Sequence, residues 1–138
     1  MPEWSSSVRV RYVETDQMGV VHHSAYLAWM EVARTEYLRS RGLPYRELEE
    51  RGIRMPVLEV GARYLAPARY DDEVLLKAEL AGASGVRFRF RYEIRRRSDG
   101  ALLCEGHTEH AATDLSGRPR RVPREMLERI GGGSREKC

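Results

Sequence analysis

Alternating apolar and charged residues predict β-strands through the second half of the chain. The clearest case is Gly85–Arg97, where every second position from Val86 to Ile94 is apolar and the positions between are mostly arginine. The apolar set is Val86, Phe88, Phe90, Tyr92 and Ile94. Such alternation is typical of an antiparallel sheet with one packed face. Similar segments predict strands over residues 53–65, 72–83 and 101–115, with a hairpin turn at Ser98–Gly100. Pro56 and Gly61 place the first of these strands at an edge or a bend.

From Ser24 the apolar residues change to helical spacing. They define one stripe, made of Tyr26, Leu27, Met30, Ala33, Tyr37 and Leu38. We expect Ser24 to cap this helix and Gly42 to stop it. The segment Pro44–Gly52 predicts a short second helix. Val8–Val13 predicts a short strand with Val8, Val10 and Tyr12 on one face.

This order of elements predicts an α+β fold in which one long central helix is wrapped by a curved antiparallel β-sheet. A single helix cannot bury its stripe alone, so it must lie against the sheet. The other face and the edges of the sheet then need partners, which points to a homo-oligomer. With 138 residues, the chain has the length of one domain over 1–138. It ends in a basic tail from about residue 116, with a helical turn predicted at "REMLERI".

Composition narrows the setting of the protein. No run approaches the roughly 18 apolar residues of a membrane span. The start, "MPEWSSSVRV", has no basic segment followed by an apolar one, so we expect a cytoplasmic protein. Of the two cysteines, Cys104 sits in an apolar run and reads as a core thiol, and Cys138 as a mobile end. The net charge of +3 leaves nucleic acid, an anionic small ligand or a solvated surface open.

Four histidines raise the question of a metal site. His22 and His23 are adjacent, so we expect their side chains to diverge. His107 and His110 are three apart on a predicted strand and should point to opposite faces. A zinc site needs three or four convergent ligands, so the sequence predicts no protein-bound metal.

Asp16 is the strongest candidate for acid–base chemistry. It lies just before a turn glycine and a few residues before the long helix. The first turn of a helix offers unpaired N–H groups and a positive dipole end, which can stabilise an oxyanion. A carboxylate beside such donors could activate water or attack a carbonyl directly. The alternative is that Asp16 only forms or caps a turn. No Gly-x-Ser-x-Gly elbow is present.

The long helix carries one anomaly, because Arg34 falls inside the apolar stripe and Glu31 at its edge. A charge among packed side chains needs a partner. The two residues are three apart and could pair with each other. Alternatively, this face reaches a pocket or a subunit interface where one of them meets a ligand.

The stretch "YVETDQMGVVHHSAYLAWMEVARTEYLRSRG" resembles the motif of the hotdog-fold acyl-CoA thioesterases, the 4-hydroxybenzoyl-CoA thioesterase and YbgC-like family. A second match is "YLAPARYDDEVLL". The resemblance covers about residues 8 to 125. It implies an acyl-CoA thioesterase acting on a small or medium acyl-CoA or acyl carrier protein. It needs no cofactor, since coenzyme A is part of the substrate.

The resemblance also implies roles for individual residues. Asp16 matches the catalytic aspartate, which acts as nucleophile or general base. His23 matches the residue at the helix start whose backbone N–H binds the thioester carbonyl oxygen. The substrate-binding positions are Gly19 in the turn, His22 and Tyr26 at the helix start, Glu31 near the acyl group, and Arg69 with Ser84, Gly85 and Val86 near coenzyme A. In that last turn, "GASGVR" offers only Arg87 as a base.

Family members form a double hotdog dimer, usually paired into a tetramer, so we expect a homodimer assembled into a homotetramer. Two other functions stay open. A hotdog hydratase or dehydratase would use a paired Asp and His side chain on an enoyl thioester. A non-catalytic module would bind acyl thioesters or, less in keeping with the residues, nucleic acid, which we do not expect as a partner.

Overall fold

The computed structural model describes residues 6–131, so Cys138 lies outside the described residues. Its elements are β1 (Ser6–Arg9), the 3-10 helix η1 (Tyr12–Glu14), α1 (His23–Ser40), α2 (Tyr45–Glu50), β2 (Val57–Tyr64), β3 (Glu73–Ala83), β4 (Arg87–Arg96), β5 (Leu102–Ala111) and α3 (Arg124–Gly131). The strands form one antiparallel sheet in the order β1-β3-β4-β5-β2. The predicted order of elements is confirmed.

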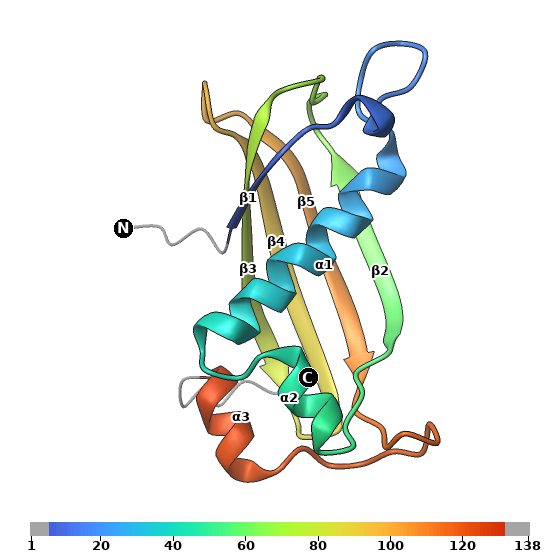
Figure 1. Ribbon diagram of the computed structural model, residues 1–138, viewed down its shortest axis with the longest axis vertical. Coiled ribbons are helices and arrows are strands. Elements are labelled where there is room, and N and C mark those ends of the chain that lie inside the picture. The colour runs from blue at the N-terminus through green and yellow to red at the C-terminus, as the bar shows by residue number, and fades with distance from the viewer. Residues whose placement is uncertain (1–5, 132–138) are drawn as a thin grey trace.

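Helix α1 crosses the concave face of this curved sheet diagonally (Figure 1). Its buried residues are Tyr26, Trp29, Met30, Ala33, Tyr37 and Leu38. Five of the six predicted stripe residues are therefore buried, whereas Leu27 is 41% exposed. Leu27 lies on the side of the helix that faces the β2 edge, where the sheet does not fully cover it. The helix and the sheet share one hydrophobic core.

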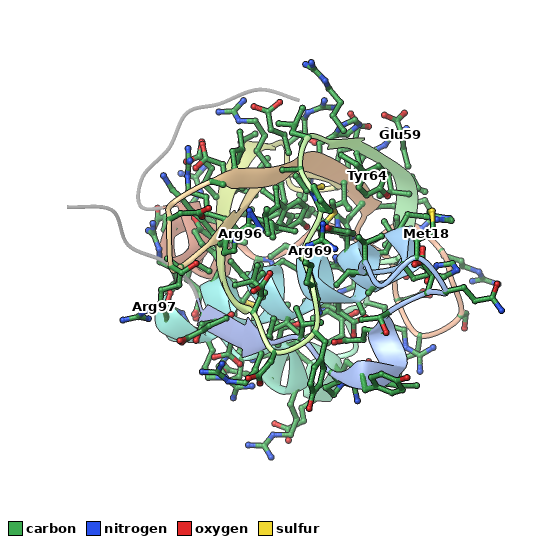
Figure 2. All side chains as sticks on the ribbon, turned by 90° about the horizontal axis from the view of Figure 1, so that it is seen from above. Met18, Glu59, Tyr64, Arg69, Arg96 and Arg97 are labelled. Atoms are coloured by element: carbon green, nitrogen blue, oxygen red, sulfur yellow. The ribbon has the colours of Figure 1, made fainter. Side chains whose placement is uncertain are left out.

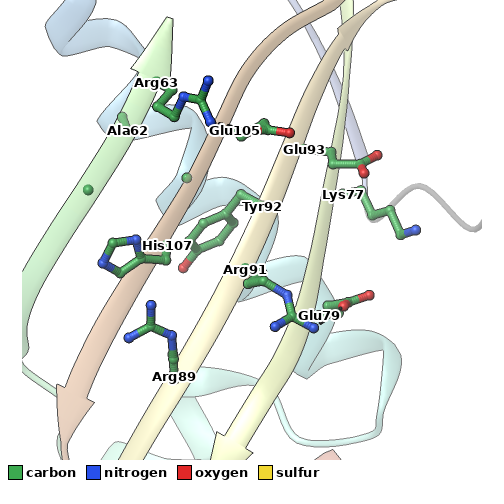
Figure 3. A pocket seen from close by; sticks show the side chains of 12 residues that line it. Ala62, Arg63, Lys77, Glu79, Arg89, Arg91, Tyr92, Glu93, Glu105 and His107 are labelled. Carbon is green, nitrogen blue, oxygen red and sulfur yellow. Dashed lines mark hydrogen bonds and ion pairs between the residues drawn. The ribbon is translucent and has the colours of Figure 1, made fainter.

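The alternation predicted for β4 is confirmed. Phe88, Phe90, Tyr92 and Ile94 are buried under α1, and the arginines between them face outward. On the outer face these arginines pair with glutamates of neighbouring strands, as in Arg91–Glu79 at 3.0 Å. Between these charges lies a hollow of about 460 Å³ whose floor includes Gly61, Ala62 and Gly106 (Figure 3). The outer face is therefore polar over its whole centre.

The first predicted strand is displaced. Among the described residues, the strand covers Ser6–Arg9 instead of Val8–Val13, and these four residues pair with β3. Val10 is buried as expected, but Tyr12 belongs to η1 and is 78% exposed. After Val10 the chain leaves the sheet to reach the start of α1. The alternation of apolar and polar residues continues past this point, so it did not predict where the strand ends.

Strand β2 lies at the edge of the sheet, as Pro56 and Gly61 predicted. It carries a bulge between Val57 and Glu59. Several apolar side chains on it are about half exposed, namely Val57, Leu58, Val60 and Tyr64. An exposed apolar edge is a place where another strand can pair.

The C-terminal end of the long helix is closed by a glycine and tied to the last helix of the chain. Gly42 stops α1 as predicted, with φ of 79° and Leu43 N donating to Leu38 O at 3.0 Å. The C-terminal turn predicted at "REMLERI" is a helix of eight residues, α3. The buried Tyr37 hydroxyl donates to Ile130 O at 2.8 Å and so fixes α3 against α1.

Two buried groups complete the core. Cys104 is fully buried, as predicted, and burial raises the pKa of its thiol to about 11. His110 is also buried, whereas His107 lies on the outer face beside Glu59, so the two do point to opposite faces. Within residues 6–131, no helix is long and apolar enough to cross a membrane.

Candidate active site

Asp16 forms a tight turn in front of α1. Its Oδ1 accepts hydrogen bonds from Met18 N at 2.8 Å and Val20 N at 3.3 Å. Gly19 N donates to the Asp16 carbonyl at 3.0 Å, and Gly19 has φ of 81°, which a side chain would strain. The turn-forming role of Asp16 is therefore confirmed. The other carboxylate oxygen, Oδ2, accepts no hydrogen bond from residues 6–131, so one oxygen is fixed and the other is open.

Helix α1 begins at His23, one residue earlier than its predicted cap. The prediction of Ser24 as N-cap is wrong, because His22 takes that place with its ring Nδ1 as acceptor, 3.5 Å from Ser24 N. An imidazole nitrogen lone pair can do what a serine oxygen does at a cap. The N–H of His23 has no hydrogen-bond acceptor within the described residues. A free amide therefore stands at the positive end of an eighteen-residue helix.

The rings of His22 and His23 are stacked, with centroids 4.8 Å apart and an interplanar angle of 28°. The expectation that they diverge is wrong. Residues in one regular conformation would diverge, but His22 is extended, with ψ of 140°, and His23 is helical. This change of backbone turns both rings the same way. No three His, Cys, Asp or Glu side chains within residues 6–131 are grouped to hold a metal.

Glu14 fastens the Asp16 turn to the helix, a role that the sequence reasoning missed. Its Oε1 accepts from Arg11 N at 2.8 Å, and its Oε2 accepts from the indole Nε1 of Trp29 at 3.3 Å. Its carbonyl accepts from His22 N at 2.7 Å. The carboxylate is only 11% exposed. One residue thus joins η1, the helix start and the first buried turn of α1. The available signal was Trp29, since a buried indole N–H needs an acceptor.

The segment before β3 brings Arg69 to this end of the molecule. Val20 and Arg69 form an isolated β-bridge, and Val21 N donates to Ala68 O at 2.8 Å. Figure 2, which looks at this end, shows Met18, Tyr64 and Arg69 around it. The guanidinium of Arg69 is exposed and makes no hydrogen bond or ion pair with any described residue. It is available for an anion.

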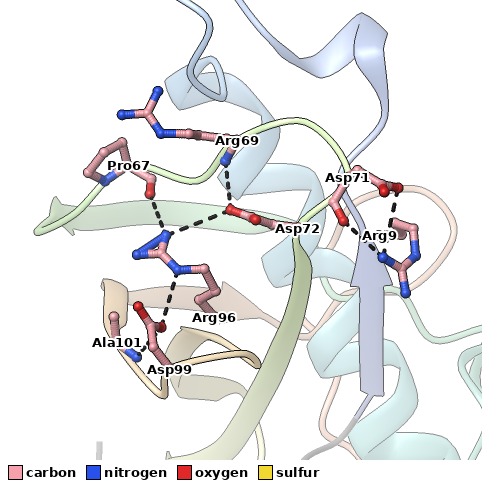
Figure 4. A network of polar contacts seen from close by, with 8 residues as sticks. All are labelled: Arg9, Pro67, Arg69, Asp71, Asp72, Arg96, Asp99 and Ala101. Carbon is pink, nitrogen blue, oxygen red and sulfur yellow. Dashed lines mark hydrogen bonds and ion pairs between the residues drawn. The ribbon is translucent and has the colours of Figure 1, made fainter.

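Arg96 holds that segment in place (Figure 4). Its Nη1 donates to Pro67 O at 2.9 Å and lies 3.7 Å from Asp72 Oδ2. The same Asp72 oxygen accepts from Arg69 N at 2.9 Å. Arg96 is a positioning residue that could not be selected from the sequence, because it lies 29 residues from Pro67 in the segment that it supports.

Tyr26 and Tyr64 support the helix start from beneath. Tyr26 is 3% exposed and packs edge-on against Trp29 and Tyr64, with centroids 4.9 and 5.1 Å away. Burial raises the pKa of its hydroxyl. The Tyr64 hydroxyl donates to His23 O at 3.4 Å. Within this chain Tyr26 supports the helix start by packing. Of these two tyrosines, only Tyr64 reaches the surface, where its ring is half exposed.

Glu31 and the coenzyme A turn lie away from Asp16. Glu31 is exposed on α1, about 12 Å along the helix axis from His23. Ser84, Gly85 and Val86 join β3 to β4 at the far end of β3, about 33 Å from its start. Figure 1 shows this turn at the end of the sheet that carries α2 and α3. A single chain therefore does not bring Ser84–Val86 beside Asp16.

A cation from the C-terminal segment lies over that distant turn. Arg121 Nη1 donates to Ser84 O at 3.0 Å, and its side chain covers Gly85. Arg120 likewise donates to Arg51 O at 2.7 Å. Arg120 and Arg121 thus bind backbone carbonyls of neighbouring loops. Arg121 adds a second base beside Arg87, which the sequence alone did not place there.

These contacts leave a carboxylate oxygen and a backbone amide open at the same end of the fold. The hydrogen bond from His22 N to Glu14 O and the bridge between Thr15 and Val21 hold the Asp16 turn against the helix start. An amide at the positive end of a helix can accept charge that develops on a carbonyl oxygen. A carboxylate next to it can act as base or nucleophile. The arrangement suits acyl transfer to water.

Comparison with known proteins defines the class. Residues 10–130 match the family profile of the Thioesterase-like superfamily, and the chain belongs to that family. The acyl-CoA thioester hydrolase YbgC of Escherichia coli O6:H1 is 33% identical over 121 residues, which cover 87% of this chain and 90% of YbgC.

Solved structures of other proteins have the same fold as this chain. A hypothetical protein, TT1821, from Thermus thermophilus is 41% identical, with a TM-score of 0.86 over 92% of this chain and 96% of that one. The DHNA-CoA thioesterase of Staphylococcus aureus is 30% identical, with a TM-score of 0.85 over 92% and 89%. The fold is the α+β hotdog fold that the sequence predicted.

The Glu14 contacts predict a measurable loss of stability. Glu14→Ala leaves the Trp29 indole without its acceptor and frees η1, so we expect the free energy of unfolding to fall by about 1–3 kcal/mol. Urea denaturation measures the change. The matched control is Glu36→Ala, which removes only an exposed ion pair with Arg39 and should cost less than about 0.5 kcal/mol. Equal losses in the two variants would contradict the role of Glu14.

Proposed function

We propose that this protein is an acyl-CoA thioesterase that hydrolyses the thioester of a small or medium acyl group carried by coenzyme A or acyl carrier protein. One observation carries the proposal: the unengaged His23 amide and the Asp16 carboxylate, which has one open oxygen, lie at the same end of the fold, where the hydrogen bond from His22 N to Glu14 O holds the Asp16 turn to the start of α1. The names of YbgC and of the DHNA-CoA thioesterase support the same reaction class. The exposed Arg69 is proposed to contact coenzyme A from the same chain, and the Ser84–Val86 turn is proposed to contact it from a second copy in the assembly.

The proposed reaction uses only groups of the chain and the substrate. The thioester carbonyl oxygen accepts a hydrogen bond from His23 N–H, which stabilises the negative charge of the tetrahedral intermediate. Water attacks the carbonyl carbon and gives its proton to Asp16 Oδ2. The C–S bond then breaks, and the coenzyme A thiolate leaves and takes up a proton. In the second form of the mechanism, Asp16 attacks the carbonyl carbon first, the C–S bond breaks and the coenzyme A thiolate leaves and takes up a proton, and water then hydrolyses the resulting anhydride and frees Asp16.

Asp16→Asn should keep the fold and lose most hydrolysis, because an amide can still accept hydrogen bonds in the turn but cannot take a proton. We expect kcat to fall by about a hundredfold or more. Release of free thiol from acyl-CoA, followed with a thiol reagent, measures this.

The chain supplies a matched control for that substitution. Asp114 forms the same turn: its Oδ1 accepts from Ser116 N at 2.8 Å and Arg118 N at 3.0 Å. Asp114→Asn makes the same chemical change at a turn that no helix follows directly. It should retain wild-type turnover. Near-wild-type activity of Asp16→Asn would refute the mechanism.

Two substitutions of His23 separate its backbone from its side chain. His23→Ala keeps the amide donor, and we expect a mild effect, within about tenfold in kcat. His23→Pro removes the N–H while suiting the first position of a helix, and His22 already has the extended backbone that precedes proline. Its kcat should fall by about a hundredfold or more. Circular dichroism confirms that α1 is retained. Equal activity of the Ala and Pro variants would exclude the amide as donor.

We also propose that the protein forms a homodimer, with two dimers assembled into a homotetramer. The half-exposed apolar side chains of β2 and its free edge support pairing of β2 with β2 of a second copy, which extends the sheet. Such pairing would bring residues of the second copy close to the open side of α1. The tetramer rests on the family resemblance.

A charge placed on this edge tests the dimer. Leu58→Lys puts an ammonium group on the proposed β2 pairing edge, near the start of the strand, and should shift the protein to a smaller species in sedimentation velocity. Leu115→Lys is the control, since Leu115 is equally exposed, at 55%, but lies in the loop after β5. An unchanged sedimentation coefficient for Leu58→Lys would show that β2 is not the interface.

Two alternative functions can be separated with the same reagents. A hydratase or dehydratase would need a histidine side chain, so His23→Ala would match Asp16→Asn in severity and water would add to an enoyl-CoA. A non-catalytic binder would hold acyl-CoA tightly and release no thiol from any substrate. The cytoplasmic location and the expectation that no nucleic acid is bound stay predictions.

A further inference from the structure

The diagonal path of α1 leaves a wedge between the helix and the sheet on the β2 side. Two hollows occupy it, of about 260 Å³ and 200 Å³. The first is lined mainly by apolar side chains, including Leu27, Met30, Val57 and Val60. Arg34 and Glu31 line both hollows and so stand at their junction. The wedge is apolar on the side of the helix start and charged farther along.

Arg34 is held in the wedge by a chain of buried hydrogen bonds. His110 Nδ1 lies 3.0 Å from the carbonyl oxygen of Met55, which can only accept, so Nδ1 carries a proton. His110 Nε2 lies 2.8 Å from Thr108 Oγ1, which in turn lies 2.6 Å from Tyr92 Oη. Arg34 Nη1 donates to Tyr92 Oη at 3.5 Å.

The donor and acceptor of each hydrogen bond in this series follow from the protonation of His110 at its buried end. Burial lowers the pKa of His110 and favours the neutral ring, whose Nε2 accepts the Thr108 proton. Thr108 Oγ1 then accepts from the Tyr92 hydroxyl. Tyr92 Oη is left with a lone pair that faces Arg34. The buried polar side chains of His110, Thr108 and Tyr92 therefore satisfy one another, and the Tyr92 oxygen also accepts from the Arg34 guanidinium.

The charges of Arg34 and Glu31 have no partner within the described residues. Arg34 is half-buried and forms no ion pair there, and the Glu31–Arg34 pairing that the sequence left open as one alternative does not occur. Glu31 is exposed, whereas Arg34 is partly desolvated, and a partly desolvated charge without a counter-ion is costly. A ligand oxygen that accepts from Arg34 would reduce this cost, and Glu31 offers a second polar contact to the same ligand group. A hydroxyl can accept from a guanidinium and donate to a carboxylate, whereas a carboxylate would be repelled by Glu31 and a methyl end would satisfy neither.

We propose that the acyl group of the substrate carries a distal hydroxyl that accepts from Arg34 and donates to Glu31. The inference rests on the proposed thioesterase function and names its substrate class. Glu31 and Arg34 lie about 12 and 16 Å along the helix axis from His23, and helical side chains lean back toward the N-terminus. The hydroxyl therefore belongs near the end of a medium-length chain, with the apolar part of the wedge around its methylenes.

The test compares hydrolysis of octanoyl- and decanoyl-CoA with that of their ω-hydroxy and ω-carboxy analogues. We expect kcat/KM to favour the ω-hydroxy form over the unsubstituted form by about tenfold at one of these lengths. Equal values at both lengths, or a preference for the ω-carboxy form, would overturn the inference while leaving the thioesterase function intact. If no acyl-CoA is cleaved, the proposed function fails and this inference fails with it.

Variants of residues in the wedge test whether Arg34 causes the preference for the ω-hydroxy substrate. Arg34→Met removes the donor and should bring the ω-hydroxy to unsubstituted ratio to about one. Arg39→Met is the control on the same helix, because Arg39 is exposed and pairs with Glu36, and it should keep the wild-type ratio. Tyr92→Phe removes only the oxygen that holds Arg34, so it should weaken the ratio less than Arg34→Met. An unchanged ratio in Arg34→Met would refute the role of Arg34.

Discussion

Burial of one face of α1 against a single curved sheet is the constraint on which the rest of this structure depends. The helix crosses the sheet diagonally, and its buried residues share a core with β3, β4 and β5. This crossing carries the helix N-terminus to the end of the sheet where β2 ends and β3 begins, so the loops there can enclose it. It also opens the wedge on the β2 side. The proposed oxyanion donor and the acyl hollow are thus two results of one packing angle.

The regular elements could be predicted because their burial is periodic. The alternation of Phe88, Phe90 and Tyr92 identified β4, and the stripe from Tyr26 to Leu38 identified α1. The errors fall where one conformation changes to another, at the end of β1 and at the His22–His23 junction. Glu14 and Arg96 were missed for another reason. Their partners are distant in sequence, Trp29 by fifteen residues and Pro67 by twenty-nine, and no local pattern encodes such a pairing.

The fold contains the Asp16 turn twice. Thr15–Asp16 and Thr113–Asp114 each begin a five-residue turn with the same aspartate contacts, a glycine at positive φ and a flanking β-bridge. The turn itself is therefore a structural device. Only the first copy is followed directly by a long helix with an unengaged amide. The difference between a turn aspartate and a candidate catalytic aspartate lies in what stands next to it.

The burial of Cys104 has a chemical consequence for an enzyme that liberates thiols. Each turnover of the proposed reaction would release a coenzyme A thiol, and oxidised coenzyme A can exchange with protein thiolates to form mixed disulfides. Exchange requires an accessible thiolate. Cys104 is fully buried, and its pKa of about 11 keeps it protonated at neutral pH. Burial therefore protects Cys104 from forming a mixed disulfide with the coenzyme A that the enzyme releases.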